Sequence, residues 1–338
     1  MGVTAKTCTK PEDYIFASSR VRMYDKRLLS REESAQFMRA ESYEEALKLL
    51  RESAYGNRLD SGELSYEDSL SRETERLRLE LGELVPGSPL LRLIYLDDLY
   101  HDLKVLVKMV LLGQDMAYLL VPLDIANLTW LENLLHRPEL NKADTPEEQT
   151  LLEVSRDYEK HHDPERLELI IDRGLYRDKR AVAEQVGSAL IQDWLREQVD
   201  FINLIILLRM RRVNKHPDWY SFAILEGGRI DRKDLEDIYL AADLPAGRRL
   251  EELGATDAVS KAWQQALEDK RPAVLEKARD EQSLAMADEA AKFTYGPEVL
   301  FAYYLQRSLE IQNLRTLMMA LRNGMSAEER HERLRIKA

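Results

Sequence analysis

One short helical pattern occurs three times in this chain, at intervals of 101 residues (102 to 203) and 110 residues (203 to 313). In each copy an Asp or Asn is followed by apolar residues one, four and five positions later. At 100° per residue these apolar residues form one stripe of an α-helix, with the Asp or Asn at its edge. A repeated core helix predicts a repeated architecture rather than a single active site, although Leu-rich helices match such a stripe easily. The copies span residues 100–108, 201–209 and 311–319, and their polar residues are Asp102, Asn203 and Asn313.

The scarcity of turn-forming residues favours helices over sheets. The 338 residues include 14 Gly and 11 Pro, below the average usage of about 7% and about 5%. Several helix starts carry a capping box, in which a Ser or Thr precedes a Glu by three residues. No alternating pattern with an Asn-Gly or Asp-Gly turn predicts a hairpin. We therefore predict an all-α chain, with capping boxes at Ser30/Glu33, Ser42/Glu45, Thr145/Glu148 and Ser326/Glu329 and long helices over about 178–212 and 297–322.

The period of the repeat predicts how the chain is divided. A spacing near a hundred residues is much longer than the roughly 20 to 50 residues of common solenoid repeats. We therefore predict three similar helical-bundle subdomains arranged around a pseudo-threefold axis. Their expected bounds are 1–113, which includes an N-terminal helix, 114–223 and 224–338.

Composition and missing motifs exclude several classes of function. The net charge of −12 argues against broad binding to nucleic acid, because that requires Lys and Arg at the phosphates. The most apolar stretch, 105–123, is interrupted by charged and amide side chains and is not expected to span a membrane. No phosphate-binding loop and no Cys pair for zinc are present. The single Cys8 fits a reducing compartment, so we expect a cytoplasmic protein without cofactor, metal or small-molecule substrate.

Two clusters of charged residues allow a functional or a structural interpretation. Asp98 and Asp102 lie one helical turn apart and resemble the acidic helix by which isoprenoid synthases hold magnesium and diphosphate. A second acidic motif on a facing helix is not clear, and carboxylates near a helix start also suit its dipole. Arg209, Arg211 and Arg212 end a helix, where cations compensate the dipole or meet an acidic partner or lipid headgroups.

Several segments, taken in order, resemble a known family. An N-terminal stretch, 14–22, precedes Leu28-Leu29, and the three helical patterns follow at their even spacing. Further matches are Tyr176, the segment Gly227-Gly228-Arg229-Ile230, and the closing Glu310-Ile311-Gln312-Asn313-Leu314-Arg315. From about residue 14 to 335 the chain is similar to the C-subunit family of bacterial and archaeal V/A-type ATPases, which is itself similar to the d subunit of the eukaryotic vacuolar ATPase.

The resemblance implies a role in a rotary machine. The family is an all-α funnel of three subdomains without catalysis of its own. It sits on the cytoplasmic face of the membrane rotor ring and receives the tip of the central shaft, made of subunits of the D/F type. We therefore expect a central-stalk rotor subunit that transmits torque for ATP-coupled proton or sodium transport. The alternatives are an isoprenoid-synthase-like enzyme using Asp98 and Asp102 with magnesium, and a generic helical scaffold.

The resemblance and the repeat together give a set of candidate polar residues. They are expected either to line a partner interface or to bond neighbouring helices within the repeats, and for the Asn residues we favour internal bonding. Asp102 stands where the other copies carry Asn, so the three copies are not expected to make identical contacts. The candidates are Arg20, Arg22, Asp102, Asn203, Arg209, Arg211, Arg212, Glu310, Asn313, Arg315 and Arg322.

Overall fold

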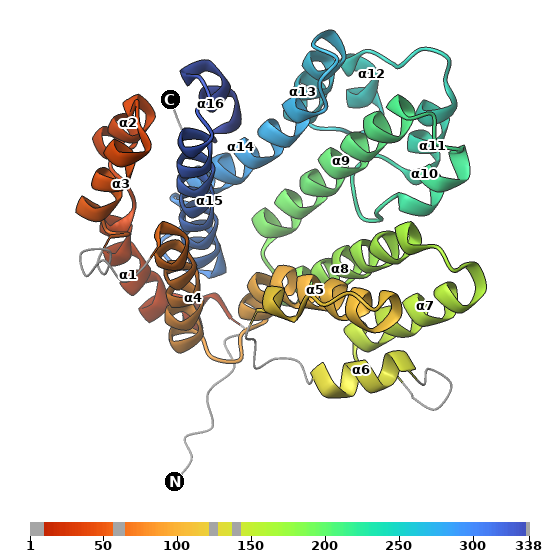
Figure 1. Cartoon of the computed structure of the whole chain (residues 1–338), viewed down its shortest axis with the longest axis horizontal. Helices are drawn as coiled ribbons and strands as arrows, with labels where there is room; N and C mark the ends of the chain where they lie inside the picture. The colour runs from red at the N-terminus through yellow and green to blue at the C-terminus, as the bar shows by residue number, and fades with distance from the viewer. Residues whose placement is uncertain (1–9, 57–64, 122–127, 137–142, 336–338) are drawn as a thin grey trace. The chain divides into compact units, whose positions relative to one another are not determined.

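The computed structural model describes residues 10–56, 65–121, 128–136 and 143–335. These residues form helices joined by turns and short extended segments, with no strand among them (Figure 1). The all-α prediction is confirmed. None of the described helices is both long and apolar enough to cross a membrane. The helices are α1 (Ile15–Tyr24), α2 (Arg31–Arg39), α3 (Tyr43–Glu52), α4 (Tyr66–Leu84), α5 (Pro89–Leu112), α6 (Leu128–His136), α7 (Pro146–His161), α8 (Pro164–Val186), α9 (Ala189–Arg212), α10 (Pro217–Ala223), α11 (Arg232–Leu240), α12 (Gly247–Glu252), α13 (Asp257–Glu268), α14 (Ala273–Ala290), α15 (Pro297–Arg322) and α16 (Ala327–Arg333), with the 3-10 turns η1 (Pro11–Tyr14), η2 (Asp25–Arg27) and η4 (Ala117–Leu119).

The predicted capping residues begin helices in the structure. Ser30, Thr145 and Ser326 each form the complete box, in which the Glu three residues later returns a bond to the cap's own N–H. Ser42 also caps its helix, but the Glu45 carboxylate accepts from the N–H of Glu41 rather than that of Ser42. Each cap satisfies a backbone donor that the helix leaves unpaired, which contributes about 1 kcal/mol.

The long helix predicted over about 178–212 is in fact two helices. α8 ends at Val186, where Gly187 adopts a left-handed conformation (φ 74°). Ser188 then caps α9 by accepting from the N–H of Ile191. The apolar periodicity continues across this break, so the Gly-Ser pair was its only sequence signal. The other predicted long helix, α15, begins and ends as expected.

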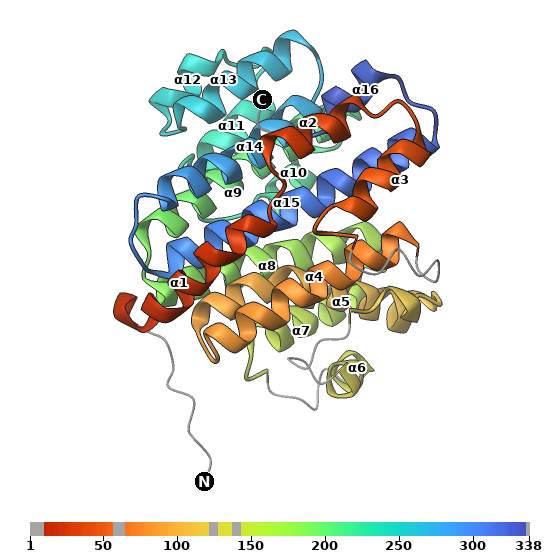
Figure 2. The ribbon, with the colours of Figure 1, turned by 90° about the vertical axis from the view of Figure 1, so that its left-hand side faces the viewer.

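Contacts within the chain divide it into two compact units. The first unit is Met1–Leu91 together with Lys277–Ala338. α15 is its central helix and contacts α1, α3, α4 and α16 (Figure 2). The third copy of the repeated stripe therefore lies in the core of this unit. The core includes Phe37, Leu50, Tyr55, Leu70, Ile311, Leu314, Leu317 and Met318.

The second unit is Arg92–Glu276, and α8 and α9 form its centre. α8 packs against α7, α9 and α10, while α11 and α13 pack against α9. The first two copies of the repeated stripe belong to this unit, and Leu103, Val107, Leu204 and Leu207 are all buried. The division into three bundles at 113/114 and 223/224, with a pseudo-threefold arrangement, stays a prediction.

The contact between α7 and α8 depends on a glycine. A Cβ at Gly174 would lie 2.3 Å from the Oγ1 atom and 2.6 Å from the Cγ2 atom of Thr150, which is fully buried on α7. Such a distance leaves no room for a methyl group unless the two helices separate. The absence of a side chain at this position thus permits their close approach.

We predict that Gly174→Ala lowers the free energy of unfolding by about 1–3 kcal/mol, because overpacking outweighs the better helix propensity of Ala. Chemical denaturation of the full chain measures the change. Adding Thr150→Ala should recover part of the loss, since it removes the colliding atoms. A single variant as stable as the wild type would contradict this account.

Candidate functional site

The polar residues of the three repeated helices hold the backbone of a segment that returns over each helix. Asn203 donates from Nδ2 to the carbonyl of Leu225 at 2.9 Å, and its Oδ1 accepts from the N–H of Leu225 at 2.8 Å. Asn313 does the same with Arg335, at 3.0 and 2.8 Å. Asp102 accepts from the N–H of Val121 at 2.8 Å. We call each of these arrangements a clasp.

Each clasp closes the same sequence of elements. A long helix that carries the Asp or Asn is followed by a short helix and then by the held segment. The long helices are α5, α9 and α15, and the short ones are η4, α10 and α16. Two of the clasps join residues on opposite sides of the predicted boundaries 113/114 and 223/224. These two clasps therefore link residues that the predicted boundaries assign to different repeats.

A second carboxylate holds the returning segment after α10. The Oδ1 atom of Asp200 accepts from the N–H groups of Arg229 and Ile230, at 2.9 and 3.2 Å. A Cβ at Gly228 would lie 2.3 Å from this Oδ1 atom. Burial raises the pKa of Asp200 to about 6, although the two backbone N–H groups favour its charged form. The Gly227–Ile230 segment found in the sequence is thus shaped to fit this buried carboxylate.

In the first unit, Glu310 links α15 to two distant segments. Its carboxylate accepts from the N–H of Leu29 at 2.9 Å and from the hydroxyl of Tyr55. Glu310 stands three residues before Asn313, as Asp200 stands three before Asn203, and both carboxylates accept backbone N–H groups. Burial raises the pKa of Glu310 to about 7, against the opposing effects of these hydrogen bonds and of Arg307.

Arg307 brings a buried positive charge to the same region. Its side chain is 2% exposed and forms an ion pair of 2.8 Å with Glu73 on α4. It also donates to the carbonyl of Arg27 and lies 4.0 Å from the centre of the Tyr55 ring. Arg307, Glu73, Tyr55 and Glu310 therefore form one network that joins α15 to α4 and to the segments beside α2 and α3.

The remaining candidates of the first unit lie at several places. Arg315 bonds Glu67 at 2.7 Å and Ser71 at 3.0 Å, which joins α15 to α4. Arg22 donates to the carbonyls of Phe293 and Thr294, before α15. Arg20 and Arg322 are exposed, and the Arg20 guanidinium lies 5.7 Å from the centre of the Tyr24 ring.

The basic cluster at the end of α9 mostly serves the second unit itself. Arg211 donates to four carbonyls at the end of α11, the shortest bond being 2.7 Å to Ala241. Arg209 pairs with Glu276 at 2.5 Å. Arg212 is exposed. Arg211 thus compensates the end of α11, while contact of Arg212 with a partner stays a prediction.

The acidic residues considered for magnesium are engaged in other contacts. Asp102 is 1% exposed and accepts from the N–H of Val121. Asp97, the neighbour of the other candidate Asp98, pairs with Lys179 at 2.6 Å. Within the described ranges, no group of three or more His, Cys, Asp or Glu side chains is arranged to hold a metal ion.

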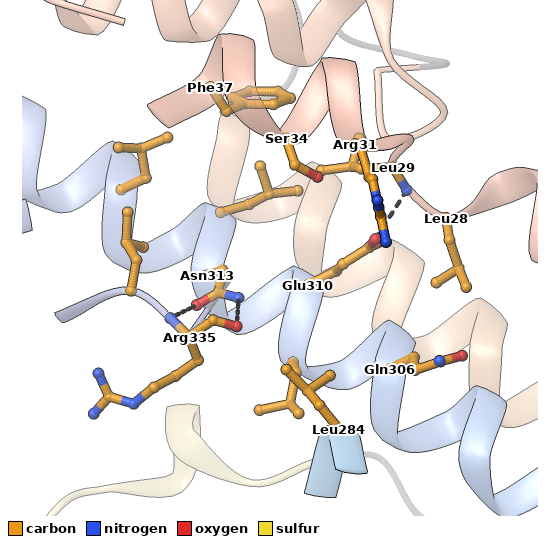
Figure 3. Close-up of a pocket in the computed structure, with 14 residues that line it drawn as sticks. Leu28, Leu29, Arg31, Ser34, Phe37, Leu284, Gln306, Glu310, Asn313 and Arg335 are labelled. Atoms are coloured by element: carbon orange, nitrogen blue, oxygen red, sulfur yellow. Dashed lines mark hydrogen bonds between the residues drawn. The ribbon is translucent and has the colours of Figure 1, made fainter. Parts of the chain in front are cut away.

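A pocket of about 220 Å³ lies beside the third clasp. Figure 3 shows its wall, with Phe37 and Ser34 from α2, Leu284 from α14 and Glu310 from α15. The held segment at Arg335 closes one side of it. Most of the lining is apolar, and the polar atoms of Glu310 and Asn313 are already bonded to Leu29 and Arg335.

Sequence reasoning missed Asp200, Arg307 and Glu73. Arg307 gave no clear signal, because it stands in the polar run Gln306-Arg307-Ser308 rather than in an apolar stretch. Asp200 lies on the same stripe edge as Asn203, one turn earlier. The sequence does not identify the partner of such a buried charge, since Glu73 lies 234 residues from Arg307.

The fold and these contacts define an all-α protein whose polar side chains mainly hold its own segments in place. The chain belongs to the ATP synthase (C/AC39) subunit family, whose sequence model matches residues 17–333. It is 22% identical over 311 residues to the C subunit of the V-type sodium ATPase of Enterococcus hirae. That alignment covers 91% of this chain and 94% of the relative. The family resemblance seen in the sequence is confirmed, and the isoprenoid-synthase alternative is not favoured.

We predict that Asn203→Ala lowers the free energy of unfolding by about 2–4 kcal/mol, because it leaves the buried N–H and carbonyl of Leu225 without partners. Denaturant titration of the full chain measures the loss. Gln312→Ala, at an exposed position on α15, is the control and should change stability by less than about 0.5 kcal/mol. If both variants behaved alike, the clasp would not contribute to stability.

Glu310 should make the first unit less stable at higher pH. Because its folded pKa of about 7 lies above the ordinary value of 4.5, the folded state binds the proton more tightly and loses stability as pH rises through this interval. We predict that, between pH 5 and pH 8, the free energy of unfolding of Glu310→Gln falls by about 2 kcal/mol less than that of the wild type.

The test compares denaturation midpoints of the two proteins across this pH range, with Glu328→Gln on the exposed face of α16 as control. Parallel pH profiles for wild type and Glu310→Gln would overturn the assignment. The comparison uses the difference between the two pH profiles, because Asp200 also has a raised pKa and affects both proteins equally.

Proposed function

We propose that this chain is a central-stalk subunit of a V/A-type ATPase that connects the rotating shaft to the membrane rotor ring. The family match over residues 17–333 carries the proposal, and the V-type sodium ATPase relative supports it over nearly the whole length of both chains. In this role the protein transmits torque between ATP-driven rotation and the transport of protons or sodium ions.

The internal contacts suit a part that must resist twisting. α15 has 26 residues, which corresponds to about 39 Å of helix. Its middle is tied by Arg307 to Glu73, by Glu310 to Leu29 and by Asn313 to Arg335. Closely packed helices with bonded polar groups transmit displacement rather than absorb it.

We further propose that the chain has no catalytic site of its own and needs no cofactor. ATP hydrolysis and ion binding would then belong to other subunits, and this chain would lie peripherally on the cytoplasmic face of the membrane. The transported ion would be set by the rotor ring. A joint that persists under load should bury more than about 1,000 Å² on association.

The proposal predicts binding to both the shaft and the ring. Purified full-length protein should co-elute with the shaft subunits of its own ATPase and with the detergent-solubilised rotor ring, and it should hydrolyse no ATP alone. In a reconstituted complex, omitting it should reduce ion transport more than ATP hydrolysis, because rotation is then uncoupled from the ring.

Two controls separate the alternatives. Thermal unfolding with and without magnesium and diphosphate tests the isoprenoid-type enzyme, which requires a stabilising shift. Co-elution with neither shaft nor ring at low salt would refute the rotor role and leave the scaffold alternative.

A further inference from the structure

An open groove of about 630 Å³ runs between α2 and α14 in the first unit. Each of the two helices presents one continuous stripe to it. Counted from Arg31, the stripe of α2 has residues at spacings of three, four, seven and eight, and counted from Lys277, that of α14 has them at four, seven, eight and eleven. The lining residues are Arg31, Ser34, Ala35, Met38 and Arg39 from α2, Lys277, Glu281, Leu284, Ala285 and Asp288 from α14, and His331 and Leu334 near α16.

The two stripes share one arrangement of small, apolar and charged residues. Ala35 and Met38 lie at the middle of one stripe, and Leu284 and Ala285 at the middle of the other. Alanines allow a third helix to approach to the usual interaxial distance of about 8–10 Å. Met fits the irregular surfaces of different side chains. The centre of the groove thus has the size and chemistry for a helix.

The α2 side of the groove is positively charged. Arg31 and Arg39 are both exposed, and neither forms an ion pair with another residue that the structure describes. Two other arginines of this unit do form ion pairs, Arg27 with Glu80 and Arg315 with Glu67. The two unpaired cations are eight residues apart, about 12 Å along the helix, which corresponds to two turns of a helix lying alongside.

The α14 side of the groove has more negative than positive side chains. Glu281 and Asp288 line it, and Lys277 pairs with Glu281 at 4.0 Å. An anionic membrane surface would be attracted by one side and repelled by the other. A guest helix with carboxylates toward α2 and cations or neutral residues toward α14 matches both sides.

The groove also adjoins the pocket of Figure 3, with which it shares Arg31, Ser34, Leu284 and Leu334. An apolar side chain of a guest helix therefore has an adjoining cavity to enter beside Ser34 and Leu284. This is the arrangement of helix-in-groove recognition, in which apolar anchors three or four residues apart enter adjacent hollows.

We infer that the α2–α14 groove receives an amphipathic helix of the central shaft. About two turns of this helix lie against Ala35, Met38 and Leu284, and its acidic residues face Arg31 and Arg39. The inference rests on the proposed function for the identity of the partner, and the groove itself sets the partner's chemistry.

Photo-crosslinking identifies the occupant. Benzoylphenylalanine replaces Met38 in the full-length chain, or Lys48 as a control, which is an exposed residue of α3 outside the groove. After irradiation with the shaft subunits, the Met38 probe should crosslink to a shaft helix that carries an acidic stripe, and the Lys48 probe should not. Crosslinks from Met38 to the chain's own segments, to a second copy, or to nothing would overturn the inference.

Affinity measurements separate this inference from the proposed function. Ala35→Trp fills the groove and Arg39→Glu reverses its charge, and each should weaken binding to the shaft at least tenfold. Gln36→Trp, at an exposed position on α2 outside the groove, should change it less than twofold. Circular dichroism verifies that each variant is folded.

The outcomes are distinct. If the wild type does not bind the shaft, the proposed function fails. If the wild type binds and the folded groove variants bind equally well, only the groove assignment fails.

Discussion

The pairing of an Asp or Asn side chain with the backbone of a returning segment is the interaction on which the repeated structure depends. After each long helix the chain forms a short helix and then a non-helical segment, whose N–H is bonded by the Asp or Asn. A buried backbone group without a partner costs about 1–3 kcal/mol. Asn offers one donor and one acceptor from a single side chain, so Asn203 and Asn313 satisfy both groups of one residue. A non-helical segment can therefore lie beside the apolar stripe, because this polar residue stands at the edge of the stripe.

The sequence predicted what depends on local spacing. The stripes, the capping residues and the bounds of α15 follow from helical periodicity and from side chains that bond within a few residues. The break at Gly187-Ser188 was missed because the apolar pattern continues through it. Asp200, Arg307 and Glu310 act through partners 29 to 281 residues away. The sequence shows that these residues are charged, but it does not show their partners, because burial and pairing are decided by tertiary packing.

Most of the polar residues that marked the family are used inside the protein. Arg211, Arg315 and the three clasp residues bond the chain's own backbone or side chains. The buried pair of Arg307 and Glu73 adds little net stability against a well-packed apolar alternative, since two charges lose their hydration. It does fix which helices meet. The exposed cations Arg31 and Arg39 of α2, which no family motif indicated, are instead directed at an open groove.

The first unit is assembled from both ends of the chain, and this has a consequence for synthesis. Phe37, Leu50 and Leu70 share one buried cluster with residues of α15, which leaves the ribosome more than two hundred residues later than α4. At about 5–20 residues per second, the delay is on the order of ten to forty seconds. During this interval the N-terminal helices expose apolar faces that only the end of the chain can cover, while the continuous second unit is free to fold. The nascent chain therefore needs protection from aggregation at its N-terminal helices, well before its last helix is translated.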